Sequence, residues 1–363
     1  MDFSPDEAQR AVTRAAAGVL ERADAPALDE PFDWSLWRRL GQAGLLALTV
    51  PDWLGGDGQG VAEAAALLTE VGRHAAPVPA LATLMTGVLP VVRWGSREAQ
   101  AAVLAGVAAG DTVLTAAIRE PSEPRPASPR TTVTQRSCYG SRVSGVKVGV
   151  PAAAAARWVL VPARVAGGGT AVAVVDPAAA GVSVLPGPGP AAEATLRLDD
   201  APVAHLLGGT DGRAVADLYQ LAVAGACAVA DGAVAAALAM TTAHVGSRQQ
   251  FGRPLAAFQA VAQQVADAYI TSRTLHLAAQ SGCWRLAAGL DAGGDLDVAA
   301  YWLAEYGPVA LRTCHHLHGG LGMDVSYPLH RYSALVSDLV RLVGGADYAL
   351  DRLGERVSCA AGG

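Results

Sequence analysis

The stretch Ser247-Arg248-Gln249-Gln250-Phe251-Gly252-Arg253-Pro254-Leu255, followed by Phe258-Gln259, decides how this chain is interpreted. It joins two long helical patterns. Arg248 is expected to end the first helix, Gly252 permits a turn, and Pro254 suits the first position of the second helix. This geometry brings a guanidinium and free backbone N–H groups to one point, as pyrophosphate binding requires. The stretch therefore predicts an anion-binding site between two helices.

The composition is that of a globular enzyme. With 363 residues, of which 52% are hydrophobic, the chain can bury a large core and form two or three domains. A net charge of -6 without a basic stripe argues against a nucleic-acid partner. The five cysteines are scattered and predict neither disulfides nor a zinc site. The acidic N-terminus lacks a leader pattern, and the apolar run Leu218 to Ala230 is too short for a bilayer, so we expect a cytoplasmic protein with no membrane contact.

The order of secondary-structure patterns predicts an α+β fold. Residues 1–112 read as an N-terminal helical domain, in which one helix is expected from Val61 to Arg73. The first helix is expected to start at Ser4-Pro5 with Ser4 as its cap. Residues 113–205 show short β-branched runs bounded by glycine and proline, which predict a small middle β domain. The runs lie at 113–118, 131–134, 157–161, 170–175, 181–185 and 194–198. Residues 206–363 return to long helices and predict a C-terminal antiparallel helix bundle.

A second motif, His316-Leu317-His318-Gly319-Gly320-Leu321-Gly322, offers glycines that let a backbone approach a phosphate closely. This motif and the first stretch, read as Arg-x-Gln-Phe-Gly, together resemble the acyl-CoA dehydrogenase family. The resemblance covers about residues 5 to 357 and includes the helix, β, bundle order. It implies FAD held between the β domain of one subunit and the bundle of a neighbour, with removal of a proton and a hydride from the α and β carbons of a CoA thioester.

The resemblance assigns the first stretch to the cofactor. Arg248 would bind the FAD pyrophosphate, and Gln250 the flavin nucleotide. Gln259 would contact the adenosine half, and Phe251, Leu255 and Phe258 would line an apolar flank. Positions 255, 258, 259 and 262 are expected on one face of the second helix. The alternative is that the apolar residues are bundle core and Arg248 is a solvated helix end.

The resemblance also assigns Gly319 and Gly320 to the cofactor, together with His316, which stands where the family usually carries glutamine. A metal site is the alternative for this histidine-rich segment. It is not expected, because no acidic or cysteine partner lies at ligand spacing from His315, His316, His318 and His330.

The residues that meet the flavin ring in the family are missing. The family carries Thr-Glu-Pro and later Lys-x-Trp-Ile-Thr in its β domain. Here Arg119 takes the place of the first threonine, Gly149 that of the tryptophan, and Pro151 that of the second threonine. Glycine offers no stacking surface and proline no backbone donor. We expect the chain's own isoalloxazine platform to be lost.

The catalytic base is missing as well. The family's usual glutamate position falls in Leu342-Val343-Gly344-Gly345-Ala346, and an alternative position early in the first bundle helix falls in Leu218 to Ala224; neither contains an acid. Asp347 is displaced from the first position by about a helical turn. Asp231 lies beyond the second and is expected to face solvent or a neighbouring polar helix face. No catalytic residue is therefore assigned.

These observations favour a non-catalytic subunit of a hetero-oligomeric, FAD-dependent acyl-CoA dehydrogenase, in a hetero-tetramer. A paralogous acyl-CoA dehydrogenase subunit would supply the flavin platform and the glutamate, and FAD would be shared with it. Bulky acyl-CoA thioesters such as steroid side chains are the expected substrates. One alternative is a homo-oligomeric dehydrogenase whose base is Asp347 or Asp231. Another is a cofactor-free acyl-thioester-binding or scaffold protein that keeps the fold alone.

Overall fold

The computed structural model describes residues 3–22, 30–136, 140–187 and 193–361, except the side chains of 136 and 359–361. The chain forms two compact units. The β unit comprises Asp6–Leu67 and Pro77–Gly225, and the bundle unit comprises Met1–Pro5, Leu68–Ala76 and Ala226–Gly363. The three domain boundaries expected from the sequence stay a prediction.

All helices of the β unit precede its sheet except the first part of α6 (Arg213–Ser247), which follows it. The preceding helices are α1 (Glu7–Leu20), α2 (Trp34–Gln42), the start of α3 (Val61–Arg73), α4 (Leu89–Trp94) and α5 (Arg97–Val103), with shorter turns η1 (Asp52–Leu54) and η2 (Leu81–Val88). The predicted cap of the first helix is wrong. Asp6, and not Ser4, caps α1, because its carboxylate accepts from the Gln9 N–H at 2.8 Å while the Gln9 side chain accepts from the Asp6 N–H.

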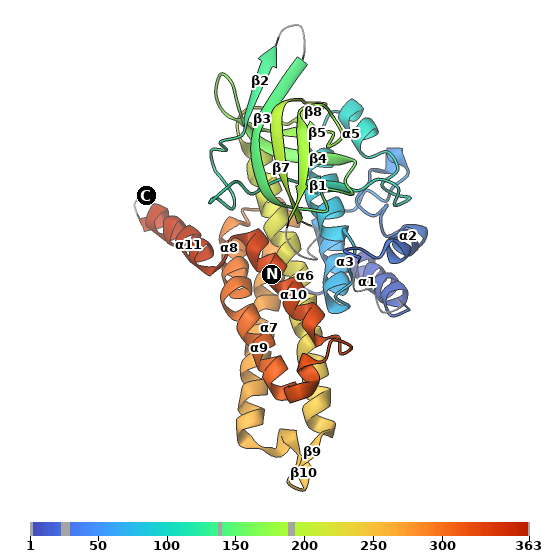
Figure 1. Cartoon of the computed structure of the whole chain (residues 1–363), viewed down its shortest axis with the longest axis vertical. Helices are drawn as coiled ribbons and strands as arrows, with labels where there is room; N and C mark the ends of the chain where they lie inside the picture. The colour runs from blue at the N-terminus through green and yellow to red at the C-terminus, as the bar shows by residue number, and fades with distance from the viewer. Residues whose placement is uncertain (1–2, 23–29, 137–139, 188–192, 362–363) are drawn as a thin grey trace. The chain divides into compact units, whose positions relative to one another are not determined.

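The sheet of the β unit runs in the order β6-β7-β3-β2-β4-β5-β8, with β1 paired parallel to β4 (Figure 1). Its strands are β1 (Leu114–Ala116), β2 (Thr132–Arg136), β3 (Gly140–Pro151), β4 (Trp158–Val165), β5 (Thr170–Val175), β6 (Val182–Pro186), β7 (Glu193–Pro202) and β8 (His205–Leu207). Valine, alanine and leucine side chains from these strands form one buried cluster. Each of the six expected runs overlaps a strand of this sheet, but no β-branched run predicted β3 or β8.

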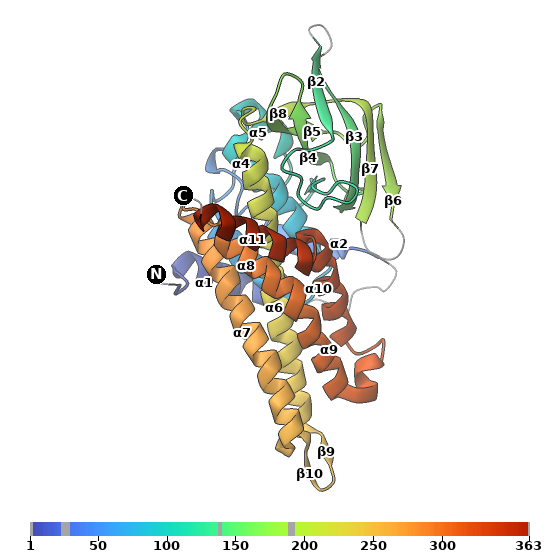
Figure 2. The same cartoon turned by 90° about the vertical axis from the view of Figure 1, so that its left-hand side faces the viewer.

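The bundle unit is built on two long helices, α6 (Arg213–Ser247, from Ala226 onward) and α7 (Gln259–Ala287), joined by a hairpin at their end (Figure 2). The remaining elements are α8 (Gly293–Tyr301), η4 (Trp302–Tyr306), α9 (Gly307–His318), η5 (Gly319–Met323), α10 (Leu329–Val343) and α11 (Ala346–Ala361). Gly232 lets α6 touch α3, since a Cβ atom there would lie 1.8 Å from the Thr69 carbonyl oxygen. The α+β fold expected from the sequence is confirmed.

The apolar run Leu218 to Ala230 belongs to α6, a 35-residue helix that is long and apolar enough to cross a membrane. The run is thus one part of a longer apolar helix. In the structure 94% of the most apolar 18-residue window is buried. This burial is that of a core helix, whose alanines permit close packing against its neighbours.

Candidate functional site

The connection between α6 and α7 is a β-hairpin. Its strands β9 (Gln249–Gln250) and β10 (Arg253–Pro254) pair antiparallel, with Phe251 and Gly252 as the two-residue loop. Both loop residues have positive φ, +52° and +77°, which defines the type I′ turn that matches the twist of paired strands. The Leu255 N–H donates to the Arg248 carbonyl oxygen at 2.9 Å and closes the hairpin.

This hairpin corrects the predicted helix restart. Pro254 lies in β10 and precedes the short 3₁₀ turn η3 (Leu255–Ala257), and α7 begins only at Gln259. Phe258 is extended, with φ -89° and ψ 128°, and acts as the N-cap residue of α7. Positions 255 and 258 therefore do not share a helix face with 259 and 262. The sequence could have shown this, because a glycine in the middle of a six-residue connection favours a hairpin.

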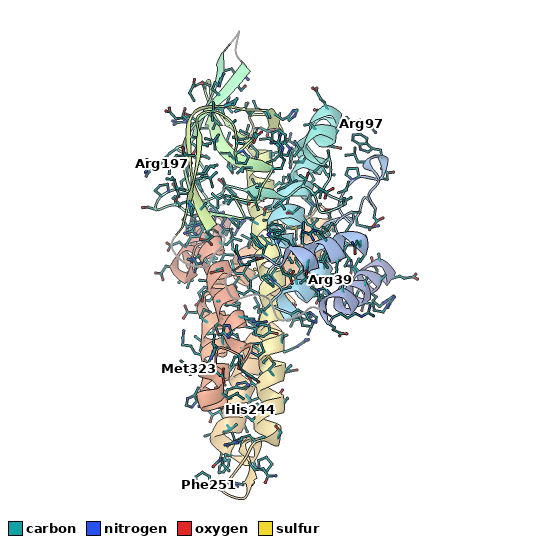
Figure 3. The ribbon with its side chains drawn as sticks, turned by 45° about the vertical axis from the view of Figure 1, so that its right-hand side comes forward. Arg39, Arg97, Arg197, His244, Phe251 and Met323 are labelled. Atoms are coloured by element: carbon teal, nitrogen blue, oxygen red, sulfur yellow. The ribbon has the colours of Figure 1, made fainter. Side chains whose placement is uncertain are left out.

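Phe251 occupies the tip of the hairpin and is 91% exposed (Figure 3). The bundle-core alternative is therefore wrong for this residue. A left-handed backbone costs a residue other than glycine about 1–2 kcal/mol, and asparagine or glycine is the usual choice at this turn position. The ring meets Phe258 edge to face at 6.2 Å, and the Arg253 guanidinium lies 4.0 Å from the Phe258 ring centre. The chain thus holds an exposed aromatic ring in a strained and well-supported turn.

Arg248 lies directly before the hairpin with its side chain exposed. Its N–H donates to the His244 carbonyl oxygen at 2.8 Å, so the backbone is fixed by the last turn of α6. The guanidinium makes no hydrogen bond or ion pair with any described residue. Gln250 and Gln259 are exposed as well. An arginine with a fixed backbone and unoccupied guanidinium donors suits a phosphate ligand from outside the chain.

The glycine motif forms the end of α9 and the turn η5. Gly319 has φ +58°, and it is exposed together with Gly320 and His316. Two histidines hold this turn in place. The His315 Nδ1–H donates to the Gly322 carbonyl oxygen at 2.9 Å, and the His318 Nδ1–H donates to the Cys314 carbonyl oxygen at 2.8 Å.

The second ring nitrogens of these histidines are also engaged. In the neutral rings Nε2 accepts, from the Ser333 hydroxyl at 2.8 Å in His315 and from the Tyr327 hydroxyl at 3.1 Å in His318. The rings therefore serve as structural hydrogen-bonding groups. Among the described residues, no group of three or more histidine, cysteine or acidic side chains could hold a metal ion.

The last turns of α6 and α9 meet through a pair of histidines. The His244 ring on α6 stacks on the His318 ring at 4.6 Å, with 19° between their planes. Burial, and then the charges of His318 and Arg248, lower the pKa of His244 below its usual 6.5. The stack links the helix end that precedes Arg248 to the helix end that carries the glycine motif. His244 was not predicted as a site residue from the sequence, although it precedes Arg248 by one helical turn.

The flavin-ring region of the β unit is filled by charged side chains. Gly149 has φ +57° and lies where the register of β3 against β7 shifts between Lys147 and Val150. A Cβ atom on Gly149 would lie 2.6 Å from Nη1 of Arg119 and 3.3 Å from Oε2 of Glu193. Both charged groups therefore occupy the space that a side chain at position 149 needs. An aromatic side chain that could stack on a flavin ring is therefore absent at position 149, whereas the exposed Arg248 offers donors that suit a pyrophosphate.

The Glu-Pro pair that precedes this region has a structural role. The buried Glu120 carboxylate accepts from Lys147 Nζ at 2.8 Å, Thr131 Oγ1 at 2.6 Å, and the N–H groups of Arg130 and Thr131. Burial opposes its charge, but these hydrogen bonds and the Lys147 charge outweigh burial and lower the pKa of Glu120 to about 2. Burial lowers the pKa of Lys147 to about 8 against the pull of Glu120. Both groups are charged at neutral pH, and they anchor the loop 120–131.

The two expected base positions carry no carboxylate. Val343 is buried, and Gly344 ends α10 in a left-handed conformation with φ +98°. Asp347 is exposed in the first turn of α11. Of the two expected surroundings of Asp231, the neighbouring helix face is confirmed: the residue is buried on α6, and the His276 ring of α7 bonds it through Nδ1 at 2.9 Å. Its interaction with His276 fixes α6 against α7.

The fold, the hairpin and the glycine turn are those of a flavoprotein dehydrogenase. The chain belongs to the acyl-CoA dehydrogenase family, whose members are oxidoreductases acting on CH–CH groups. The acyl-CoA dehydrogenase N-terminal domain model matches residues 6–111, and the C-terminal domain model matches residues 220–356.

Three relatives make the family membership specific. The chain is 47% identical to acyl-CoA dehydrogenase FadE28 of Mycobacterium tuberculosis, over 99% of both chains. The ChsE4-ChsE5 complex of Mycobacterium tuberculosis is similar with a TM-score of 0.91 and 32% identity, over 99% of both chains. A Tcur3481-Tcur3483 steroid ACAD variant gives a TM-score of 0.90 and 33% identity, covering 98% of this chain and 99% of that one. Two of these relatives are solved as assemblies of two different proteins.

Proposed function

We propose that this chain is the non-catalytic subunit of a hetero-oligomeric, FAD-dependent acyl-CoA dehydrogenase. It would contribute Arg248, Gln250, Phe251 and the Gly319-Gly320 turn to FAD seated in a paralogous partner. The partner would supply the flavin platform and the catalytic glutamate. The steroid ACAD among the relatives supports a bulky acyl-CoA, such as a steroid side-chain thioester, as the substrate. The ChsE4-ChsE5 complex supports assembly with a paralogue.

The observation that carries the proposal is an asymmetry between two regions of the chain. The ring position at Gly149 is filled by Arg119 and Glu193, and the two base positions have no acid. The side chain of Arg248, in contrast, is exposed, and its backbone is fixed by a hydrogen bond to the last turn of α6. A chain that had lost flavin chemistry altogether would have no physical reason to keep Phe251 strained and exposed at the hairpin tip. An arm that acts on another subunit explains both regions.

The residues of this chain would act in binding and orientation. Bound FAD supplies hydride acceptance from the β carbon of the thioester. Arg248 would donate charge-assisted hydrogen bonds to the pyrophosphate oxygens, and the exposed glycine turn would add backbone N–H donors. Phe251 would cover apolar surface on the partner and exclude water. Because no acid of this chain would reach the substrate, proton abstraction would belong to the partner.

Co-expression with the acyl-CoA dehydrogenases encoded beside this chain tests the proposal. The mass and visible spectrum of the purified complex are measured, together with turnover of an acyl-CoA. We expect a colourless chain alone and a yellow, active complex with one paralogue. A chain that purifies alone as a yellow, active homotetramer would support the homo-oligomeric alternative. A complex without flavin absorbance would support the cofactor-free alternative.

A further inference from the structure

The space beside Gly149 is occupied by charged side chains of the same chain. Three backbone features converge there. The Val148 N–H donates to the Arg119 carbonyl oxygen at 3.0 Å, so the Arg119 backbone is fixed beside Gly149. Glu193 begins β7 and pairs in register with Pro151, two residues beyond Gly149. The shift in strand register between Lys147 and Val150 places Gly149 in a bulge, the kind of irregularity that redirects side chains.

The two charged groups at this point have opposite signs. Nη1 of Arg119 and Oε2 of Glu193 lie 2.6 Å and 3.3 Å from the place of a Cβ atom on Gly149, so both approach the same small volume. Both residues are half-buried, which strengthens their attraction relative to bulk water. A flavin ring needs an apolar, flat surface here. To bind at this position it would have to displace the Arg119 guanidinium.

We infer that Arg119, whose guanidinium fills the side-chain space over Gly149 beside the Glu193 carboxylate, is a plug that closes the flavin-ring position of this chain's own β unit. The inference rests on the proposed function and deepens it, because the plug fixes where flavin can bind in the hetero-oligomer. FAD binds only at the partner's platform, and the complex carries one flavin for each pair of different chains. Arg119 is therefore a specificity-determining residue for cofactor placement.

Flavin content of the hetero-oligomer tests the plug. Flavin is released by denaturation and measured by absorbance, and the mass of the intact complex gives the number of chains. The platform is restored by Gly149→Trp with Pro151→Thr, either with Arg119 kept or with Arg119→Thr added. We expect one flavin per two chains while Arg119 is kept, and a rise toward one per chain when Arg119→Thr is added. Arg164→Thr, an exposed arginine of the same sheet, is the matched control and should cause no rise.

A wild-type hetero-oligomer with one flavin per chain overturns the inference. The inference is also overturned if the complexes with the restored platform assemble and contain the same amount of flavin with and without Arg119→Thr. If the restored variants do not assemble, the smaller change Gly149→Ala decides. It should lower the melting temperature of the complex less in an Arg119→Ala background than in the wild type, because the clash with Nη1 is gone. An equal shift in both backgrounds overturns the plug.

Failure of the plug is distinguishable from failure of the proposed function. The proposed function fails if no paralogue forms a flavin-containing complex with this chain. The plug fails only within a complex that has formed and that holds flavin. The Gly149→Ala comparison needs no bound flavin and reports on the packing around Arg119 alone.

Discussion

Replacing Lys147 by methionine removes one partner of a fully buried ion pair. The side chains of Lys147 and Glu120 are 0% and 1% exposed, so neither charge can turn to water. Lys147→Met leaves the Glu120 carboxylate charged and buried, with donors only from Thr131 and Arg130. Breaking a buried pair from one side typically costs about 3–5 kcal/mol. We expect a loss of that size in the free energy of unfolding of the β unit.

The double variant Lys147→Met with Glu120→Gln is the matched control. Both charges are then absent, and the amide of the new side chain still accepts from Thr131. We expect the double variant to lie within about 2 kcal/mol of the wild type, because replacing both partners of a buried pair is far less costly than removing one. Urea unfolding followed by circular dichroism measures all four members of the cycle.

Acid titration gives the same pair a second readout. The pKa of Glu120 is lowered from 4.5 to about 2 in the folded chain. Its stabilising contribution is therefore complete above pH 4.5 and is lost as the pH falls toward 2, by about 3 kcal/mol at 1.36 kcal/mol per pKa unit. Glu120→Gln should flatten the stability profile in that window. A Lys147→Met variant within about 0.5 kcal/mol of the wild type, with an unchanged acid profile, would refute the reasoning.

Three further outcomes are expected. Arg248→Gln should weaken flavin retention by the complex about 10–100-fold, since a hydrogen bond to a charged group contributes about 1.5–3 kcal/mol. The control Arg312→Gln, at another exposed arginine of the bundle unit, should leave the visible spectrum and the yield of the complex unchanged. Phe251→Asn should raise the melting temperature of the isolated chain by relieving up to about 1 kcal/mol of left-handed strain, yet loosen the complex in analytical ultracentrifugation. The pKa of His244 is lowered when folded, so the stability of the His244–His318 stack falls as the pH drops below 6.5. His244→Phe should remove that dependence in thermal melts at pH 5 to 7, and an unchanged profile would contradict the assignment.

The sequence predicts those parts of the fold that depend on local periodicity. The helical pattern from Val61 to Arg73 matches α3 residue for residue, and the β-branched run from Thr170 to Val175 is β5. Caps are harder to predict, because Ser4 and Asp6 both suit an N-terminus. Asp6 caps α1 because Gln9, three residues later, can complete the reciprocal pair of hydrogen bonds.

The candidate site likewise has one part that local sequence predicts and another part that depends on tertiary packing. The anion-binding connection is predictable, because charge, glycine and proline lie together in the stretch around Arg248. The plug is not, because Arg119, Gly149 and Glu193 are brought together by strand pairing over long separations in sequence. The stack of His244 on His318 likewise depends on which faces of α6 and α9 meet. Side-chain neighbours set by tertiary packing leave no local pattern.

The hairpin between α6 and α7 bears on how quickly two subunits can join. Its turn is closed by a backbone hydrogen bond and its flank is covered by Arg253 on Phe258, so the arm is ordered before any encounter. Ordering a loop during association costs conformational entropy. The preorganised backbone of the arm avoids that loss, and only exposed side chains such as Arg248 remain to be ordered. Docking can therefore proceed as a rigid-body event, with a rate set by diffusion and orientation rather than by folding.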